Sequence, residues 1–339
     1  MVHDFKTFNQ LVEKARQDHN IQSNDSLTSI AFLKEHSYYT LVNGYQRALE
    51  SKEKSEFFKD GFTIEQLGFI QINETLLSSN LLWLIISVEK HFKTLLQNQI
   101  SEKIGIGQND YLIAKPYSGN NFAEKNKVIN KLKTVATGLY RGREGQPVYT
   151  EHVSNSLLKY RKEGNVPPWI LVNDLTLGEA MRWFNILPSE FKKSIVSEFN
   201  INISDYEIAI EFFSMAMDLI RQYRNGLAHG DIINKIRSTT ELHIDHLEML
   251  FPNTSIISRP EYTNNNIGRS DLYALLLSLV VLSSKTHIWL FKNDFLNRLE
   301  TMENLLKSDS SSIRRILNVP DNLAFRINLL IPDPENQYD

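Results

Sequence analysis

Apolar residues recur three and four positions apart along most of the chain, which is the periodicity of helices with one buried face. The segment 76–104 is long, strongly apolar and free of glycine and proline, so we predict a central helix there. A second helix is predicted from Tyr206 to Ile220 on the apolar stripe Ile208, Phe212, Met215, Ala216 and Leu219. No alternating strand pattern of useful length occurs. The sequence therefore predicts an all-α protein.

Several helix ends can also be predicted. Apolar positions indicate a helix over 5–16, and Ser26 is the expected cap of the next helix. Thr63 should cap a helix from Ile64, and Thr176 with Glu179 forms a capping box for a helix over 177–187. The apolar run 272–282 is only eleven residues long, too short to span a bilayer, and reads as a buried helix. The segment 252–268 is expected to be a loop.

Composition narrows the class of protein. At 339 residues and 42% hydrophobic content the chain can form one large domain or two. It has no cysteine, which excludes disulfides and thiolate metal sites and suits a reducing compartment. The first residues lack the features of a secretory signal, so a cytoplasmic location without membrane contact is expected. The net charge of −3 means that any nucleic-acid surface must be local.

One segment, 125–162, carries such a local charge: nine lysines and arginines against Glu144 and Glu151. Sequence-independent affinity for nucleic acid comes from cations that neutralise phosphates, so this is the candidate RNA surface. An ordinary solvated helix face with a glycine-rich loop explains the pattern equally well. The RNA-binding candidates in this segment are Lys125, Lys127, Lys131, Lys133, Arg141 and Arg143. We add Arg221, which directly follows the helix predicted over 206–220.

The strongest chemical signal is Arg224-Asn225-x-x-Ala228-His229 at the end of the 206–220 pattern. A histidine can accept or donate a proton near neutral pH, and a guanidinium matches two phosphate oxygens. Together they suit attack of a ribose 2′-hydroxyl on its own phosphodiester, which needs no metal. On an ideal helix Arg224 and His229 lie about 140° apart, whereas Asn225 and His229 share a face, so the amide could orient the imidazole. A cationic helix end explains the same residues without chemistry.

This motif resembles the R-N-x-x-A-H signature of HEPN ribonucleases, in particular abortive-infection (Abi) proteins of the AbiD/AbiF type. Three further blocks, 38–45, 57–64 and 167–178, resemble segments of the same proteins. The chain departs from that pattern at Asn173, where a glutamate is usual, and at Ile232, where an arginine is frequent. Asp174 could replace the glutamate only with a shift of register, and Asn234 is displaced by one position.

The resemblance implies a HEPN-like helical bundle over 71–250 that includes a basic insertion at 115–165. Helical additions would occupy 1–70 and 269–339. It further implies an endoribonuclease of an antiphage system, in which Arg224 stabilises the scissile phosphate, His229 is the general acid/base and Asn225 orients it. Because such proteins join two copies of the motif, a homodimer is expected. The alternatives are a non-catalytic protein that binds RNA, including a small regulatory RNA, and a helical protein that meets only other proteins.

The sequence does not decide the roles of two other groups of polar residues. Glu89 on the central helix pairs at i,i+4 with Lys93, which favours a solvated face, although Glu89 and His91 could also approach the motif. His243 and His246 flank Asp245, but the sequence shows no third ligand at a defined spacing. We therefore expect no metal and no cofactor.

Overall fold

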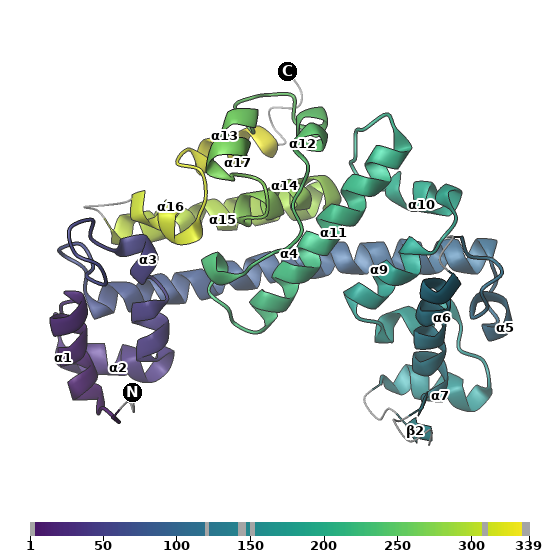
Figure 1. Cartoon of the computed structure of the whole chain (residues 1–339), viewed down its shortest axis with the longest axis horizontal. Coiled ribbons are helices and arrows are strands. Elements are labelled where there is room, and N and C mark those ends of the chain that lie inside the picture. The colour runs from purple at the N-terminus through teal and green to yellow at the C-terminus, as the bar shows by residue number, and fades with distance from the viewer. Residues whose placement is uncertain (1–3, 119–121, 142–146, 150–152, 307–310, 334–339) are drawn as a thin grey trace.

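The computed structural model describes residues 4–118, 122–141, 147–149, 153–306 and 311–333, and one long helix organises all of them. This helix, α4, runs over Ile64–Lys103 for 40 residues, a length of roughly 60 Å at the α-helical rise. Thr63 caps it, as predicted, and Gln66 completes a capping box. The helix expected from Ile64 and the central helix predicted over 76–104 are thus one helix. Figure 1 shows α4 as the axis along which the other helices are arranged.

The N-terminal helices pack on one another and, in part, on α4. They are α1 (Phe8–His19), α2 (Ser26–His36), the π-helical turn η1 (Tyr39–Asn43) and α3 (Gln46–Leu49). The predicted cap of α2 is wrong by one residue. The side chain of Asp25 accepts a hydrogen bond from the Thr28 amide at 3.0 Å, so Asp25 caps α2 and Ser26 is already helical.

The centre of the bundle is formed by α4 with α9 (Leu177–Asn185), α10 (Ser189–Val196) and α11 (Tyr206–Ala228). α11 crosses α4 obliquely (Figure 1). Phe92, Phe184 and Phe213, one from each of α4, α9 and α11, form a buried ring cluster with centroids 5.2–5.8 Å apart. Such aromatic contacts fix the relative positions of the three helices that carry the candidate site.

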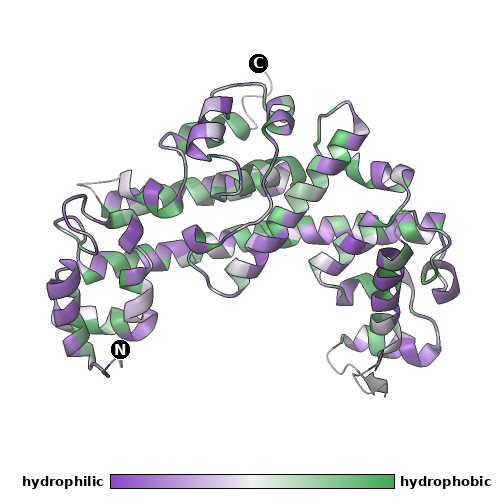
Figure 2. Cartoon of the chain, in the orientation of Figure 1, coloured by the Kyte–Doolittle hydropathy of each residue, from purple (hydrophilic) through white to green (hydrophobic). Residues whose placement is uncertain are grey.

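The C-terminal part is also helical. It contains η3 (Ile233–Lys235), α12 (Ile244–Leu250), α13 (Arg259–Asn265), α14 (Leu272–Leu282), α15 (Lys285–Leu305), α16 (Ser311–Leu317) and α17 (Leu323–Leu330). α14 spans the predicted apolar run and is apolar on nearly all sides (Figure 2). The predicted loop at 252–268 instead contains α13, because Pro260 in the first turn is compatible with a helix start.

α4 is long and apolar enough to cross a membrane, judged by length and composition. In this structure α2, α11 and α15 pack against it, as expected for a helix in the core of a protein.

α4 is continuous across residue 70, where the sequence suggested that the bundle begins.

A separate lobe projects from the C-terminal half of α4 (Figure 1). It comprises α5 (Gln108–Tyr111), α6 (Phe122–Thr137), β1 (Leu139–Arg141), β2 (Pro147–Tyr149), α7 (Asn155–Glu163), α8 (Pro168–Leu171) and η2 (Val172–Asp174). The two strands pair antiparallel within the glycine-rich stretch that was expected to be a loop. Apart from this hairpin, the described residues form an all-α fold, as predicted.

Candidate functional site

The signature motif lies at the C-terminal end of α11, which runs eight residues beyond the predicted stripe. Arg224 and Asn225 are therefore helical, and His229 is the C-cap, its amide donating to the carbonyls of Asn225 and Gly226 at 3.1 Å. A Cβ atom on Gly226 would lie 2.7 Å from the Ile236 side chain. The glycine thus lets the chain fold back closely after the helix.

Arg224 forms an ion pair with Glu89 of the central helix. Its Nε atom lies 3.7 Å from a Glu89 carboxylate oxygen, whose other oxygen contacts the Lys93 ammonium at 2.7 Å. Lys93 in turn donates a 2.6 Å hydrogen bond to the Leu175 carbonyl, just before α9. Glu89 is buried, and the cations of Arg224 and Lys93 compensate its charge and fix its position. Of the two readings of Glu89, the structure favours proximity to the motif, whereas His91 packs on Phe199.

A pocket of about 390 Å³ lies between α9 and α11, beside Arg224. Three arginines line it, Arg182 from α9 and Arg221 and Arg224 from α11, with Asp218 as the one carboxylate. The other lining residues are Thr176, Leu177, Gly178, Met181, Asn185 and Asn225. The lining carries a net charge of +2, from three guanidinium groups and one carboxylate. It therefore favours an anion, and a guanidinium fits phosphate in particular.

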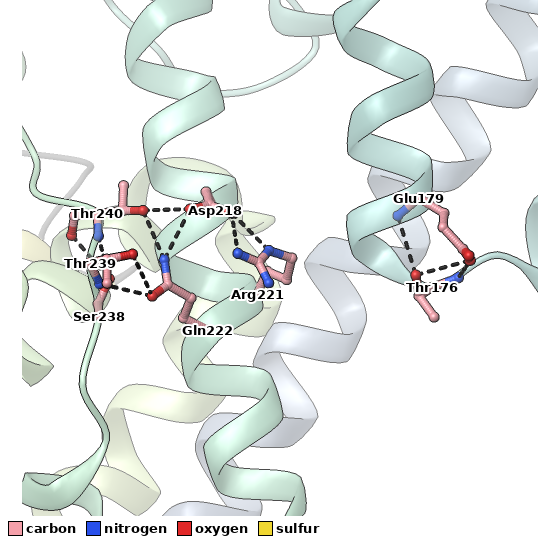
Figure 3. A network of polar contacts seen from close by, with 8 residues as sticks. All are labelled: Thr176, Glu179, Asp218, Arg221, Gln222, Ser238, Thr239 and Thr240. Carbon is pink, nitrogen blue, oxygen red and sulfur yellow. Dashed lines mark hydrogen bonds and ion pairs between the residues drawn. The ribbon is translucent and has the colours of Figure 1, made fainter. Parts of the chain in front are cut away.

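The side chain of Arg221 is held at the wall of this pocket by Asp218 (Figure 3). The Arg221 Nε donates to Asp218 at 2.7 Å, and the same carboxylate accepts from Gln222 at 3.0 Å and from Thr240. Burial opposes ionisation of Asp218, but the hydrogen bonds from Thr240 and Arg221 lower its pKa below the usual range. A Cβ atom on Gly178 would lie 3.1 Å from the Arg221 Cδ, so the glycine allows this close approach of α9 to α11.

His229 is placed differently from Arg224. It is exposed, and it is not among the residues that line the arginine pocket. Within the described chain no hydrogen bond joins the Asn225 amide to the His229 ring, so the expected orienting contact is not formed. The chain thus presents the arginine and the asparagine in a pocket and the histidine on the surface beyond it.

The predicted RNA-binding lysines belong to α6, next to this pocket. Lys131 contacts Glu179 in the first turn of α9 at 3.1 Å, and Lys127 and Lys133 are exposed. Lys125 is engaged with the Tyr117 carbonyl at 3.1 Å. Arg141 belongs to β1, where the structure describes the backbone only. Arg143 lies outside the described residues.

A buried network around Glu74 was not predicted from the sequence. Glu74 is 1% exposed; one oxygen accepts the Ile233 amide at 2.8 Å, and the other lies 2.6 Å from the Tyr45 hydroxyl. Tyr45 also contacts Gln71 at 2.6 Å. Glu74 therefore ties the aromatic block at 38–45 and the segment after the signature to α4. Periodicity could not identify it, because a glutamate on a long helix is normally solvent-exposed.

The two departures from the family pattern have local explanations. The Asn173 amide donates to the Trp169 carbonyl at 2.8 Å, and Asp174 binds Ser154, the cap of α7. Asp174 is thus engaged in holding α7 to the loop before α9. Ile232 is buried, and a Cβ on Gly44 would lie 2.4 Å from it, so an arginine there would displace the aromatic block.

The fold and the site together define an all-α protein with an arginine-lined pocket beside the end of a signature helix. A family described as Abi-like protein matches residues 31–234, which include the pocket, Glu74 and the whole signature. The match covers more than half of the chain, so this protein belongs to the Abi-like family. Comparison with curated proteins and with solved structures gave no match.

Proposed function

We propose that this protein is a metal-independent endoribonuclease of a bacterial antiphage abortive-infection system. It would cut RNA by attack of a 2′-hydroxyl on the adjacent phosphodiester. The observation that carries the proposal is the pocket between α9 and α11, where Arg182 and Arg221 converge with Arg224 of the signature. Membership of the Abi-like family supports the biological setting, and the R-N-x-x-A-H motif supports a HEPN-type reaction of the AbiD/AbiF kind.

The roles follow from the chemistry of each side chain. Arg224, restrained by Glu89, would bind the scissile phosphate and stabilise the charge that grows on it in the transition state. His229 would take the proton of the 2′-hydroxyl or return one to the leaving 5′-oxygen. Arg221 and Arg182 would hold the neighbouring phosphate, and Lys127, Lys131 and Lys133 on α6 would extend this surface along the RNA.

The proposed site is shared between two subunits of a homodimer. Arg224 and Asn225 face the pocket, whereas the exposed His229 lies outside it, so a single chain presents the two catalytic groups apart. In a dimer with twofold symmetry, the histidine of one subunit can complete the arginine pocket of the other, and this happens twice. Asn225 would then orient the histidine of the partner across the interface.

The second candidate is an RNA-binding protein that holds a small RNA without cutting it. The same exposed position of His229 favours this candidate if no dimer forms. The arginine pocket and the α6 lysines would then provide the whole function. The protein would be expected in the cytoplasm in either case, because its proposed ligand is RNA.

The experiment is cleavage of a mixed RNA pool in EDTA by wild type, Arg224→Ala and His229→Ala. Arg259→Ala is a matched control, because Arg259 pairs with Asp245 and Glu248 away from the pocket. Cleavage by wild type and the control alone is the expected result. Equal cleavage by all four proteins would refute the assignment. No cleavage by any of them, with RNA bound by wild type but not by Arg224→Ala, would establish the binding protein.

A further inference from the structure

A cluster of three side chains of the kind that bind metals lies away from the arginine pocket. Glu211 belongs to α11, His243 is the N-cap of α12, and His246 follows in its first turn. One donor atom from each lies within 4.8 Å of the others. The fold thus supplies the third ligand that the sequence around the two histidines lacks, from a helix 32 residues upstream.

The spacing of the donor atoms is close to that of a zinc site. The His243 Nδ1 lies 3.7 Å from one Glu211 oxygen, and the His246 Nε2 lies 3.9 Å from the other. Zn²⁺ binds histidine nitrogen and carboxylate oxygen at 2.0–2.2 Å, so two ligands on a tetrahedron are separated by about 3.3–3.6 Å. Small rotations of the half-exposed Glu211 and His243 would close the remaining difference.

His246 is a buried histidine whose Nε2 would gain a partner from a metal ion. It is 6% exposed, and its Nδ1 is buried without a hydrogen-bond partner within the described chain. Its Nε2 is too far from Glu211 for a hydrogen bond. A buried imidazole without any hydrogen bond is costly.

We propose that Glu211, His243 and His246 bind one zinc ion, with water at the remaining position. Two imidazoles and one carboxylate suit zinc better than magnesium or calcium, which prefer oxygen ligands alone. Asp245, the other nearby carboxylate, is paired with Arg259 at 2.6 Å, which leaves Glu211 as the acidic ligand. His243 and Glu211 are more than half exposed, so the ion can exchange with solvent.

The ion would join α11 to α12 and close the segment between residues 211 and 243, which contains the whole signature. It would therefore stabilise the folded state, since metal that binds only the native protein shifts the unfolding equilibrium by mass action. Both histidines lie beyond residues 31–234, whereas Glu211 lies within the part of the chain that matches the family. RNA cleavage by Arg224 and His229 does not involve this ion.

The test is direct measurement of zinc binding by the full chain, purified without a histidine tag and freed of metal. Isothermal titration with ZnCl₂ should give one site per wild-type chain, and Zn²⁺ should raise the midpoint of thermal unfolding. Glu211→Gln and His243→Ala, both at exposed positions, should weaken binding at least about tenfold. Each should also abolish the thermal shift.

His287→Ala is the matched control, because His287 is an exposed histidine on α15 beside Trp83. It should bind zinc like wild type. Co²⁺ should give the visible absorption of a tetrahedral site in wild type and in this control, but not in His243→Ala. The proposal is overturned if wild type takes up no stoichiometric zinc, or if Glu211→Gln and His243→Ala bind as tightly as wild type.

Discussion

Replacing the buried Glu74 by alanine should destabilise the protein strongly. The change leaves the Ile233 amide without an acceptor and removes one of the two partners of the Tyr45 hydroxyl. A buried polar group that loses its partner costs about 1–3 kcal/mol. Because Tyr45 keeps its contact with Gln71, only the Ile233 amide loses its sole partner. We therefore expect a loss of about 1–3 kcal/mol in the free energy of unfolding, out of a total of roughly 5–15 kcal/mol.

The assay is urea unfolding followed by circular dichroism. Glu102→Ala is the control on the same helix, because Glu102 is exposed and contacts only Lys103; its effect should stay within about 0.5 kcal/mol. Glu74→Gln keeps the shape of the side chain and should cost far less than Glu74→Ala. A loss below about 1 kcal/mol for Glu74→Ala, or equal losses for both variants, would refute the role of Glu74 in linking α4 to the aromatic block and the signature.

The pH dependence of the same variants tests the protonation of Glu74. Burial raises its pKa, although the hydrogen bonds from Tyr45 and the Ile233 amide oppose the shift. The folded state then holds the proton more tightly than the unfolded state. The resulting stabilisation is complete below the ordinary glutamate pKa of about 4.3 and is lost as the pH rises through the folded-state pKa. Glu74→Gln should therefore gain stability relative to wild type as the pH rises above the ordinary glutamate pKa, and a constant difference would contradict this.

Three further predictions concern the proposed site. Glu89→Gln should lower cleavage on the order of 10–100-fold in single-turnover assays, because Arg224 loses the carboxylate that restrains it; activity equal to wild type would show that the contact is incidental. Arg182→Ala should weaken RNA binding and reduce the slope of log affinity against log salt concentration by roughly 0.7, the effect of one phosphate contact on single-stranded RNA. Fluorescence anisotropy measures this slope, with Arg259→Ala as the control. An unchanged slope would show that Arg182 does not contact the RNA. Mixing inactive Arg224→Ala and His229→Ala subunits should restore about a quarter of wild-type activity. Half of the randomly formed dimers are mixed, and each mixed dimer has one intact site of two. No recovery in dimers shown to exchange subunits would place the catalytic pair within one chain.

Much of the fold could be predicted from the sequence because the signals are local. Apolar patterns located α4 and α11, a continuous apolar run located α14, and the caps at Thr63 and Thr176 fixed where two helices begin. The family resemblance, stated from four blocks, agrees with the match to the Abi-like family. The errors were also local: Asp25 rather than Ser26 caps α2, and a short helix occupies part of a proline-containing loop.

The site was less predictable because it depends on contacts between distant segments. Arg182 had no signal of its own and enters the pocket only because α9 lies against α11. Glu74 and Glu211 resemble ordinary helical glutamates until the segment after the signature folds back onto α4 and α11. The i,i+4 pair of Glu89 and Lys93 could suggest a solvated face, but α9 and α11 cover it.

The most direct test of the central proposal compares an RNA oligonucleotide with its 2′-deoxy copy as substrates for wild-type protein in EDTA. Attack by the 2′-hydroxyl predicts that only the RNA is cut and that the products carry 2′,3′-cyclic phosphate and 5′-hydroxyl ends. Cleavage of the deoxy copy, or products with 5′-phosphate and 3′-hydroxyl ends, would contradict the account, because those outcomes require water rather than the ribose as the nucleophile.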